Sequence, residues 1–154
     1  SYYCNLFMQY HFFETTGQMH FTPPVQTIYA ARQALDEYFR EGEEAKWNRH
    51  LEVFEAIHAG LDKLGFKDII KRDIQAGLGV TVKYPDDENW SFEKIHDYCY
   101  ERGFTIYPGK TSAQNTFRLC ALGAITKDDI EDFFVVLYEA LKVNNIKIPI
   151  HYDA

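Results

Sequence analysis

One arginine lies within an apolar stretch, residues 117–123 (FRLCALG), that predicts a strand over residues 116–122. A guanidinium in such a strand is costly to bury unless an anion meets it. The neighbours of Arg118 on its strand face would be Thr116, Cys120 and Leu122, and none of them is acidic. Arg118 therefore either pairs with a distant Asp or Glu, reaches water, or grips a ligand carboxylate with its planar fork. The residues alone leave these roles open.

Two other stretches combine chemistry-bearing residues with a defined local structure. In residues 19–25 (MHFTPPV), Thr22 precedes two prolines and predicts the cap of a helix. Such a helix start can bind phosphate or carboxylate, although plain capping is the commoner role. Residues 103–110 (GFTIYPGK) end a predicted strand at a Tyr-Pro-Gly turn. That turn can present Tyr107 at a cleft, although a simple loop explains it too.

The sequence contains no complete catalytic motif: GxSxG, GxxxxGK[ST], HExxH and GxGxxG are all absent. The nearest metal-ligand pair is His96 with Cys99 on one helical face. Without a second ligand pair, a helix side facing the core is the favoured interpretation. Cys4, Cys99 and Cys120 form no CxxC pair and predict free thiols in a reducing compartment, the cytoplasm.

Length and composition limit the class of protein. The chain has 154 residues, of which 46% are hydrophobic and 16% aromatic, so it is neither disordered nor of low complexity. The net charge of −7 argues against a nucleic acid or an anionic membrane as partner. The longest apolar run, residues 133–138, is too short to span a bilayer.

Hydrophobic periodicity indicates the elements that position these residues. Residues 1–20 are aromatic without steady helical spacing and predict surface that packs against something else. Four helices are predicted, at residues 23–41, 44–64, 92–99 (capped by Ser91) and 127–141 (with a Thr126/Asp129 capping box). Strands are predicted at residues 78–84, 104–107 and 116–122, with a weaker candidate at 66–70, a polar loop at 110–115 and an irregular tail from 146. This order predicts an α/β (α+β two-layer) fold, a short, mainly antiparallel sheet covered by helices.

Three motifs resemble one enzyme family: residues 20–42 (HFTPPVQTIYAARQALDEYFREG), 101–110 (ERGFTIYPGK) and 115–133 (NTFRLCALGAITKDDIEDF). Together they resemble the C-terminal part of class V, pyridoxal-phosphate-dependent aminotransferases, and look most like 2-aminoethylphosphonate:pyruvate transaminases. The similarity runs from about Tyr3 to Leu141 with order and spacing preserved. Alanine–glyoxylate and serine–pyruvate enzymes share much of this frame, so the resemblance is more specific for the class than for the phosphonate.

The resemblance implies roles for individual residues. Arg118 matches the arginine that binds the substrate carboxylate. Thr22 matches the threonine that reaches the cofactor phosphate of the neighbouring subunit in a homodimer, and His20 would lie near the same site. The implied domains are a remnant of the large cofactor-binding domain at 1–22, an interdomain helix at 23–44 and the small C-terminal domain of the fold-type I enzymes at 45–154.

The resemblance also implies that essential groups lie elsewhere. In this family the Schiff-base lysine, the aspartate on the pyridine nitrogen and the aromatic on the ring lie upstream of these motifs. No lysine here, such as Lys46, Lys83 or Lys110, occupies that position. The chain is therefore expected to be a C-terminal fragment without catalytic or metal-binding residues of its own and inactive alone.

The expected reaction of the intact enzyme transfers an amino group from 2-aminoethylphosphonate to pyruvate through pyridoxal phosphate, giving phosphonoacetaldehyde and alanine. One alternative is another class V activity of the alanine–glyoxylate or serine–pyruvate type. A second is a non-catalytic α/β module whose anion pocket surrounds Arg118 and the helix start at Thr22.

Overall fold

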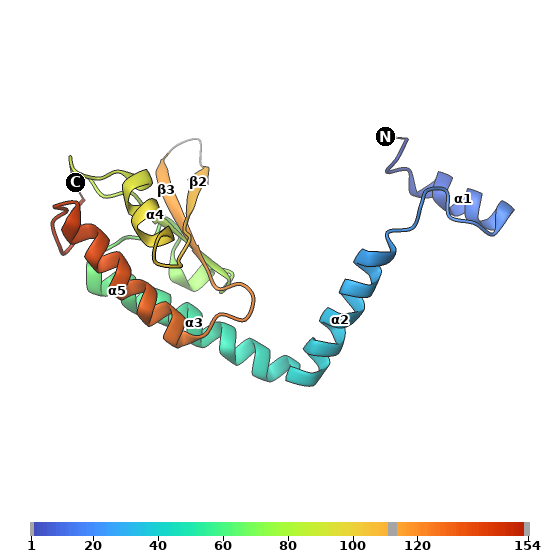
Figure 1. Cartoon of the computed structure of the whole chain (residues 1–154), viewed down its shortest axis with the longest axis horizontal. Coiled ribbons are helices and arrows are strands. Elements are labelled where there is room, and N and C mark those ends of the chain that lie inside the picture. The colour runs from blue at the N-terminus through green and yellow to red at the C-terminus, as the bar shows by residue number, and fades with distance from the viewer. Residues whose placement is uncertain (1, 111–113, 153–154) are drawn as a thin grey trace. The chain divides into compact units, whose positions relative to one another are not determined.

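The computed structural model describes residues 2–110 and 114–152. The chain divides into two compact units, and the boundary falls between Glu43 and Glu44 (Figure 1). This boundary is a property of the backbone packing. The roles that the resemblance assigns to residues 1–22, 23–44 and 45–154 stay predictions.

The first unit begins with a helix that the sequence pattern did not predict. Helix α1 covers Leu6–Thr16; the Asn5 side chain accepts a hydrogen bond from the Met8 amide, and Gly17 ends the helix in the left-handed conformation. No residue of α1 is buried, and its aromatic side chains are spread around the helix. Local capping therefore specifies this helix without an apolar stripe, which is why periodicity missed it.

Helix α2, Val25–Glu41, corrects the expected helix start. Pro24 is the N-cap residue, and no side chain caps the first turn. Thr22 therefore lies three residues before the helix and does not cap it, because Pro24 adopts a non-helical ψ of 67°. The predicted end is confirmed, since Gly42 follows the last residue with a φ of 88°.

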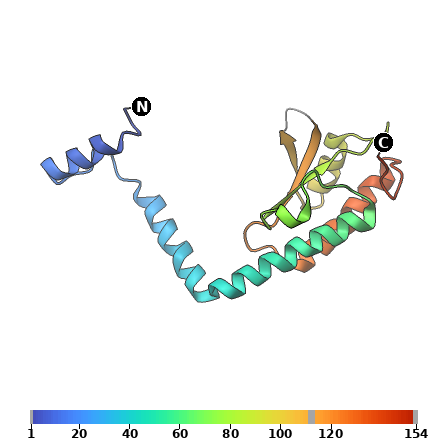
Figure 2. The same cartoon turned by 180° about the vertical axis from the view of Figure 1, so that it is seen from behind.

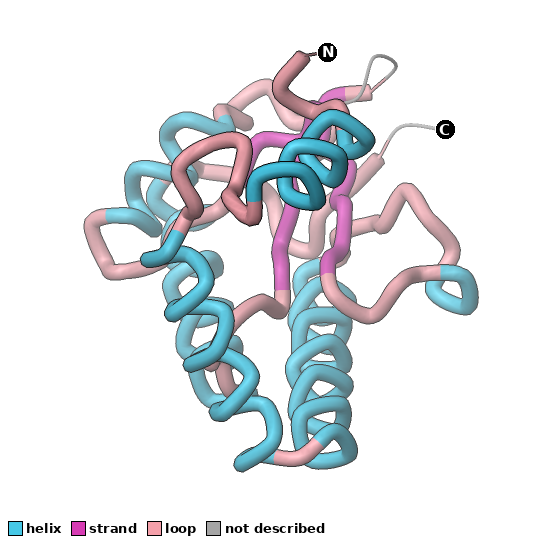
Figure 3. The backbone as a smooth tube through the Cα atoms, turned by 90° about the vertical axis from the view of Figure 1, so that its right-hand side faces the viewer, coloured by secondary structure: helices cyan, strands magenta, loops and turns pink. Residues whose placement is uncertain are grey.

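The second unit contains the predicted sheet and its helices. Strands β1 (Gly79–Lys83), β2 (Tyr107–Lys110) and β3 (Asn115–Cys120) form an antiparallel sheet in the order β1-β3-β2 (Figure 3, magenta). The helices are α3 (Glu43–Leu64), α4 (Phe92–Tyr100) and α5 (Lys127–Val143), with a 3-10 turn at Arg72–Ile74. The α/β fold class is therefore confirmed.

One face of the sheet carries the core of this unit. The side chains of Val80, Val82, Phe117 and Leu119 are buried together with apolar residues of α3, α4 and α5. Helices α3 and α5 lie side by side (Figures 1 and 2). Their close approach requires Gly60, because a Cβ atom there would collide with the Phe134 ring. The predicted caps of α4 and α5 are confirmed: Ser91 accepts from Lys94, and Thr126 and Asp129 form a capping box.

Three local expectations need correction or completion. The predicted strand 104–107 begins only at Tyr107 and continues through Pro108-Gly109, because β2 is an edge strand where proline costs no needed ladder bond. The weak strand at 66–70 forms a single bridge, Asp68 with Val82. The expected tail contributes buried Ile146 and Ile150 to the core. Of the polar loop 110–115, residues 111–113 lie outside the described residues, as do 153–154.

Candidate functional site

Arg118 lies at the centre of the sheet face that no core helix covers. In the antiparallel register Arg118 pairs with Thr81 of β1 on one side and with Tyr107 of β2 on the other. Directly paired residues share a face, so these three side chains form one row across the sheet. The flanking residues Phe117 and Leu119 point to the buried face. The sheet therefore presents a guanidinium between two hydroxyl-bearing side chains.

The guanidinium of Arg118 is exposed, which revises the expectation of a costly buried charge. Alternation along β3 resolves the apparent conflict, because the apolar neighbours face the core while Arg118 faces outward. Its guanidinium donates to the carbonyl of Pro108, with an Nη2–O distance of 3.4 Å. Within residues 2–110 and 114–152, no carboxylate forms an ion pair with Arg118. Three roles were expected for Arg118: an ion pair within the chain, contact with water, or binding of a ligand carboxylate. The described residues do not provide the first of these.

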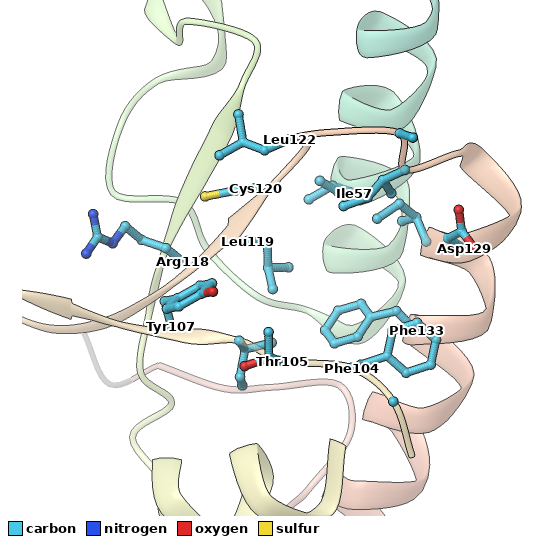
Figure 4. A pocket seen from close by; sticks show the side chains of 15 residues that line it. Ile57, Phe104, Thr105, Tyr107, Arg118, Leu119, Cys120, Leu122, Asp129 and Phe133 are labelled. Atoms are coloured by element: carbon cyan, nitrogen blue, oxygen red, sulfur yellow. The ribbon is translucent and has the colours of Figure 1, made fainter. Parts of the chain in front are cut away.

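A recess of about 640 Å³ begins beside this row. Its inner wall is apolar and comes from α3, α5 and the segment before β2, whereas Arg118, Tyr107 and Cys120 line its sheet side. The Arg118 side chain extends away from Ile57, Phe104 and Phe133 (Figure 4). The charged end therefore lies on the open side of the sheet, and only the base of the arginine borders the apolar wall.

The open sheet face favours a small anion. Its strand positions carry no acidic side chain among the described residues; besides the central row they are Gly79, Lys83, Gly109, Thr116 and Cys120. Lys83 adds a second cation, although Asp86 pairs with it at 3.3 Å. A planar guanidinium with free N–H groups binds carboxylate or a phosphorus oxyanion through two parallel hydrogen bonds. The arrangement can therefore hold an anionic substrate group.

Thr22 and His20 lie in the first unit, so they are described apart from Arg118. The His20 ring packs among Phe12, Phe21 and Tyr2, and its Nε2 atom is 3.3 Å from the Tyr2 hydroxyl. The His20 Nδ1 atom is buried and has no hydrogen-bond partner among the described residues. Thr22 is exposed. An exposed hydroxyl and a ring nitrogen without a partner among the described residues are groups that can hydrogen-bond to a phosphate.

The candidate metal pair separates into two different environments. Cys99 is fully buried in the core, and burial raises the pKa of its thiol to about 11. His96 instead lies 2.9 Å from the Asp97 carboxylate through Nδ1 and stacks on Tyr100. No group of three metal-ligating side chains occurs in the described part of the chain. All three cysteines, Cys4 included, are free of disulfides.

Sequence reasoning missed a polar cluster beneath the sheet edge. His58 of α3 is buried 3.2 Å from Asp68, and Arg72 bridges Asp68 and Asp62. Gln75 completes the cluster by donating to Asp68. These residues are up to 17 positions apart and form no motif, so only the fold brings them together. The cluster fixes the segment before β1 against α3.

Comparison with known proteins gives consistent matches over nearly the whole chain. The chain is 31% identical over 145 residues to a 2-aminoethylphosphonate–pyruvate transaminase of Cupriavidus pinatubonensis. The match covers 94% of this chain and 38% of that protein. A transaminase of the same name from Burkholderia ambifaria is 35% identical over 135 residues, covering 87% and 36%. The chain therefore spans less than two fifths of the relatives it matches. No protein-family model matches the chain.

Solved structures show the same fold. Ureidoglycine–glyoxylate aminotransferase of Bacillus subtilis superposes with a TM-score of 0.75 at 18% identity, covering 92% of this chain and 37% of that one. Pyridoxamine–pyruvate aminotransferase of Mesorhizobium loti gives 0.74 at 23% identity, covering 83% and 33%. No described helix is both long and apolar enough to cross a membrane. The resemblance predicted from the three motifs is thus confirmed: the chain is similar, over nearly its whole length, to the C-terminal part of class V aminotransferases and has the corresponding part of their fold.

Proposed function

We propose that the chain is the C-terminal part of a pyridoxal-phosphate-dependent transaminase that moves an amino group from 2-aminoethylphosphonate to pyruvate. The products are phosphonoacetaldehyde and alanine. The observation that carries the proposal is the exposed Arg118 guanidinium, which lies on an open sheet face without a carboxylate partner among the described residues. The sequence similarity to transaminases of that name, and the shared fold, support it.

Arg118 is the proposed anchor for the substrate anions. Its fork binds the carboxylate of pyruvate or alanine in one half-reaction and the phosphonate of the amine donor in the other. Both anions present two acceptor oxygens at comparable spacing, so one planar donor pair serves both. Because Arg118 binds the anionic end of either substrate at one point, the reacting carbon is held at one place relative to the cofactor. Such positioning lowers the entropic part of the activation barrier.

Pyridoxal phosphate is the proposed cofactor of the intact enzyme. When bound, it takes up the amino group and stabilises the negative charge that develops on the substrate carbon. In this chain Thr22 and His20 are the candidates for contact with its phosphate, and we propose that they serve the neighbouring subunit of a homodimer. The cofactor-attaching lysine is proposed to lie outside these 154 residues, so the chain by itself is expected to be inactive.

The test is Arg118→Lys in the intact enzyme, with steady-state kinetics for both substrates. Lysine keeps the charge but loses the fork, so kcat/KM is expected to fall for 2-aminoethylphosphonate and for pyruvate alike. The matched control is Arg102→Lys, an exposed arginine of the same unit that stacks on Tyr98. Unchanged kinetics for both substrates with Arg118→Lys would refute the proposed anchor.

Substrate assays also separate the alternative activities. A wild-type enzyme that uses alanine with glyoxylate, or serine with pyruvate, but not 2-aminoethylphosphonate belongs to another class V activity. A protein that binds small anions through Arg118 without any amino transfer is the non-catalytic module. The three cysteines, none of them in a disulfide, support a reducing compartment, which we propose is the cytoplasm. The net charge of −7 argues against nucleic acid as a partner.

A further inference from the structure

Tyr107 occupies the position across from Arg118 in the sheet register. Paired residues of neighbouring antiparallel strands have Cα atoms roughly 5 Å apart and point to the same face. Figure 4 shows the two side chains extending in different directions, so the exposed Tyr107 side chain must turn toward a ligand that Arg118 holds. Tyr107 is 57% exposed, and its hydroxyl makes no hydrogen bond within the described residues. Tyr107 thus supplies an exposed phenol at the register position next to Arg118.

The backbone of β2 links these two side chains. The carbonyl of Pro108, the residue after Tyr107, accepts the hydrogen bond from the Arg118 guanidinium. Arg118 is therefore directed toward the strand that carries Tyr107. On the other side, Thr81 has a short side chain and is half-buried. Tyr107 is therefore the more exposed of the two neighbours of Arg118 in this row.

We infer that Tyr107 is a specificity-determining residue that favours phosphonate over carboxylate at the Arg118 site. The inference rests on the proposed function and names the group that distinguishes its two substrates. A carboxylate has two oxygens, and both are satisfied by the guanidinium fork. A tetrahedral phosphonate has a third oxygen outside the plane of the fork, and the Tyr107 hydroxyl donates a hydrogen bond to it.

The surrounding groups support this assignment. Lys83, the other cation on the same face, is held by Asp86 and lies over the Tyr152 ring at 5.1 Å. Cys120 offers only a weak thiol donor and lies in the next row, opposite Gly79. Among the described residues of this face, Tyr107 is therefore the exposed hydroxyl donor that is paired with Arg118 and available for an oxygen that the guanidinium leaves unpaired.

The decisive variant is Tyr107→Phe in the intact enzyme with its cofactor. Loss of one hydrogen bond to a charged oxygen is expected to lower kcat/KM for 2-aminoethylphosphonate about 10- to 100-fold. The value for pyruvate is expected to stay within about twofold, because the carboxylate does not use this donor. Tyr100→Phe removes another exposed phenol, from α4, and is the matched control. Equal losses for both substrates, or no loss for either, overturn the inference.

A direct binding measurement separates this inference from the proposed function. Methylphosphonate and acetate are titrated into the 154-residue chain, and the Arg118 Nε–Hε signal is followed by NMR. Wild type is expected to bind methylphosphonate more tightly than acetate, and Tyr107→Phe is expected to lose that preference. If wild type shows no preference, the inference fails even where transamination is found. If the preference is present but 2-aminoethylphosphonate is not a substrate, the proposed function fails and the role of Tyr107 stands.

Discussion

The Cα atom of Gly109 lies directly against the Thr116 side chain, and a Cβ atom added at Gly109 would collide with the Thr116 hydroxyl. The two residues are paired across β2 and β3, and Thr116 is only 1% exposed. Glycine at this position lets the edge strand lie close over a threonine that would otherwise face water. The contact sets the position of β2 and, through the Pro108 carbonyl, the direction of Arg118.

Gly109→Ala is expected to lower the free energy of unfolding by about 1–3 kcal/mol, the usual cost of overpacking. The collision involves the Cβ atom and backbone of Thr116 as well as its hydroxyl, so rotation of one side chain does not relieve it. Urea denaturation followed by circular dichroism measures the loss. Because β2 must shift, anion binding at Arg118 is expected to weaken in the same variant.

Gly79→Ala is the matched control for that experiment. Gly79 lies in the same sheet with an ordinary φ, and its added Cβ would meet the Cys120 sulfur at 3.3 Å, a contact that a small movement relieves. Its cost is expected to be clearly smaller than that of Gly109→Ala. Equal destabilisation by the two variants would show that loss of glycine from the sheet, and not the Thr116 contact, is responsible.

The contact between α3 and α5 gives a second prediction, for Gly60→Ala. The added methyl group would overlap the Phe134 ring near its attachment to the chain, so the helices must separate. A loss of about 1–3 kcal/mol in unfolding free energy is expected, although alanine is the better helix former. The double variant Gly60→Ala/Phe134→Leu is expected to recover part of the loss. Wild type, the two single variants and the double variant form a double-mutant cycle. If the losses of the two single variants simply add in the double variant, the proposed collision is contradicted.

The sequence predicted those elements whose signals are local and periodic. The stripe of α3, the alternation of Val80 and Val82, and the capping pair Thr126/Asp129 each agree with the structure. These patterns succeed because burial repeats with the helical or strand period, and because a cap involves residues only three positions apart.

The expectations that failed depended on tertiary context. Thr22 resembles a cap in composition, but the conformation of Pro24 places the helix start two residues later than predicted, at Val25. Pro108 was expected to end a strand, and the edge position of β2 lets it continue. Arg118 was expected to face a burial cost because a sequence does not reveal which face of a strand the helices cover. Only the sheet register identifies Thr81 and Tyr107 as its neighbours.

The buried His58 cluster leads to the last prediction, a loss of stability between pH 7 and pH 5. Burial is the largest effect on the pKa of His58 and lowers it, and Arg72 also lowers it, while Asp68 and Asp62 act in the opposite direction. The His58 Nδ1 atom is 3.2 Å from Asp68, yet the two are not aligned for a hydrogen bond, so burial prevails. The folded chain thus binds a proton here less readily than the unfolded chain does.

The sign of the pH effect follows from that difference. The contribution of neutral His58 to the free energy of unfolding is fully present above the ordinary histidine pKa of about 6.5. It decreases as the pH falls below that value, because the unfolded state takes up the proton first. Ordinary carboxylates stay ionised in this range, and the Arg72 hydrogen bond lowers the pKa of Asp62 further. Tm is therefore expected to be lower at pH 5 than at pH 7, measured by calorimetry at constant ionic strength.

Two variants test whether His58 causes the difference in Tm between pH 7 and pH 5. His58→Leu removes the buried titrating group, so the difference in Tm between pH 7 and pH 5 is expected to shrink, whatever the change in absolute stability. His151→Asn removes an exposed histidine and is expected to leave the difference intact. A difference that survives in His58→Leu and disappears in His151→Asn would place the proton uptake at the surface. Because Asp68 also bridges to β1 through Val82, protonation of His58 is expected to loosen this edge of the sheet first, as amide exchange at Ile69 would measure.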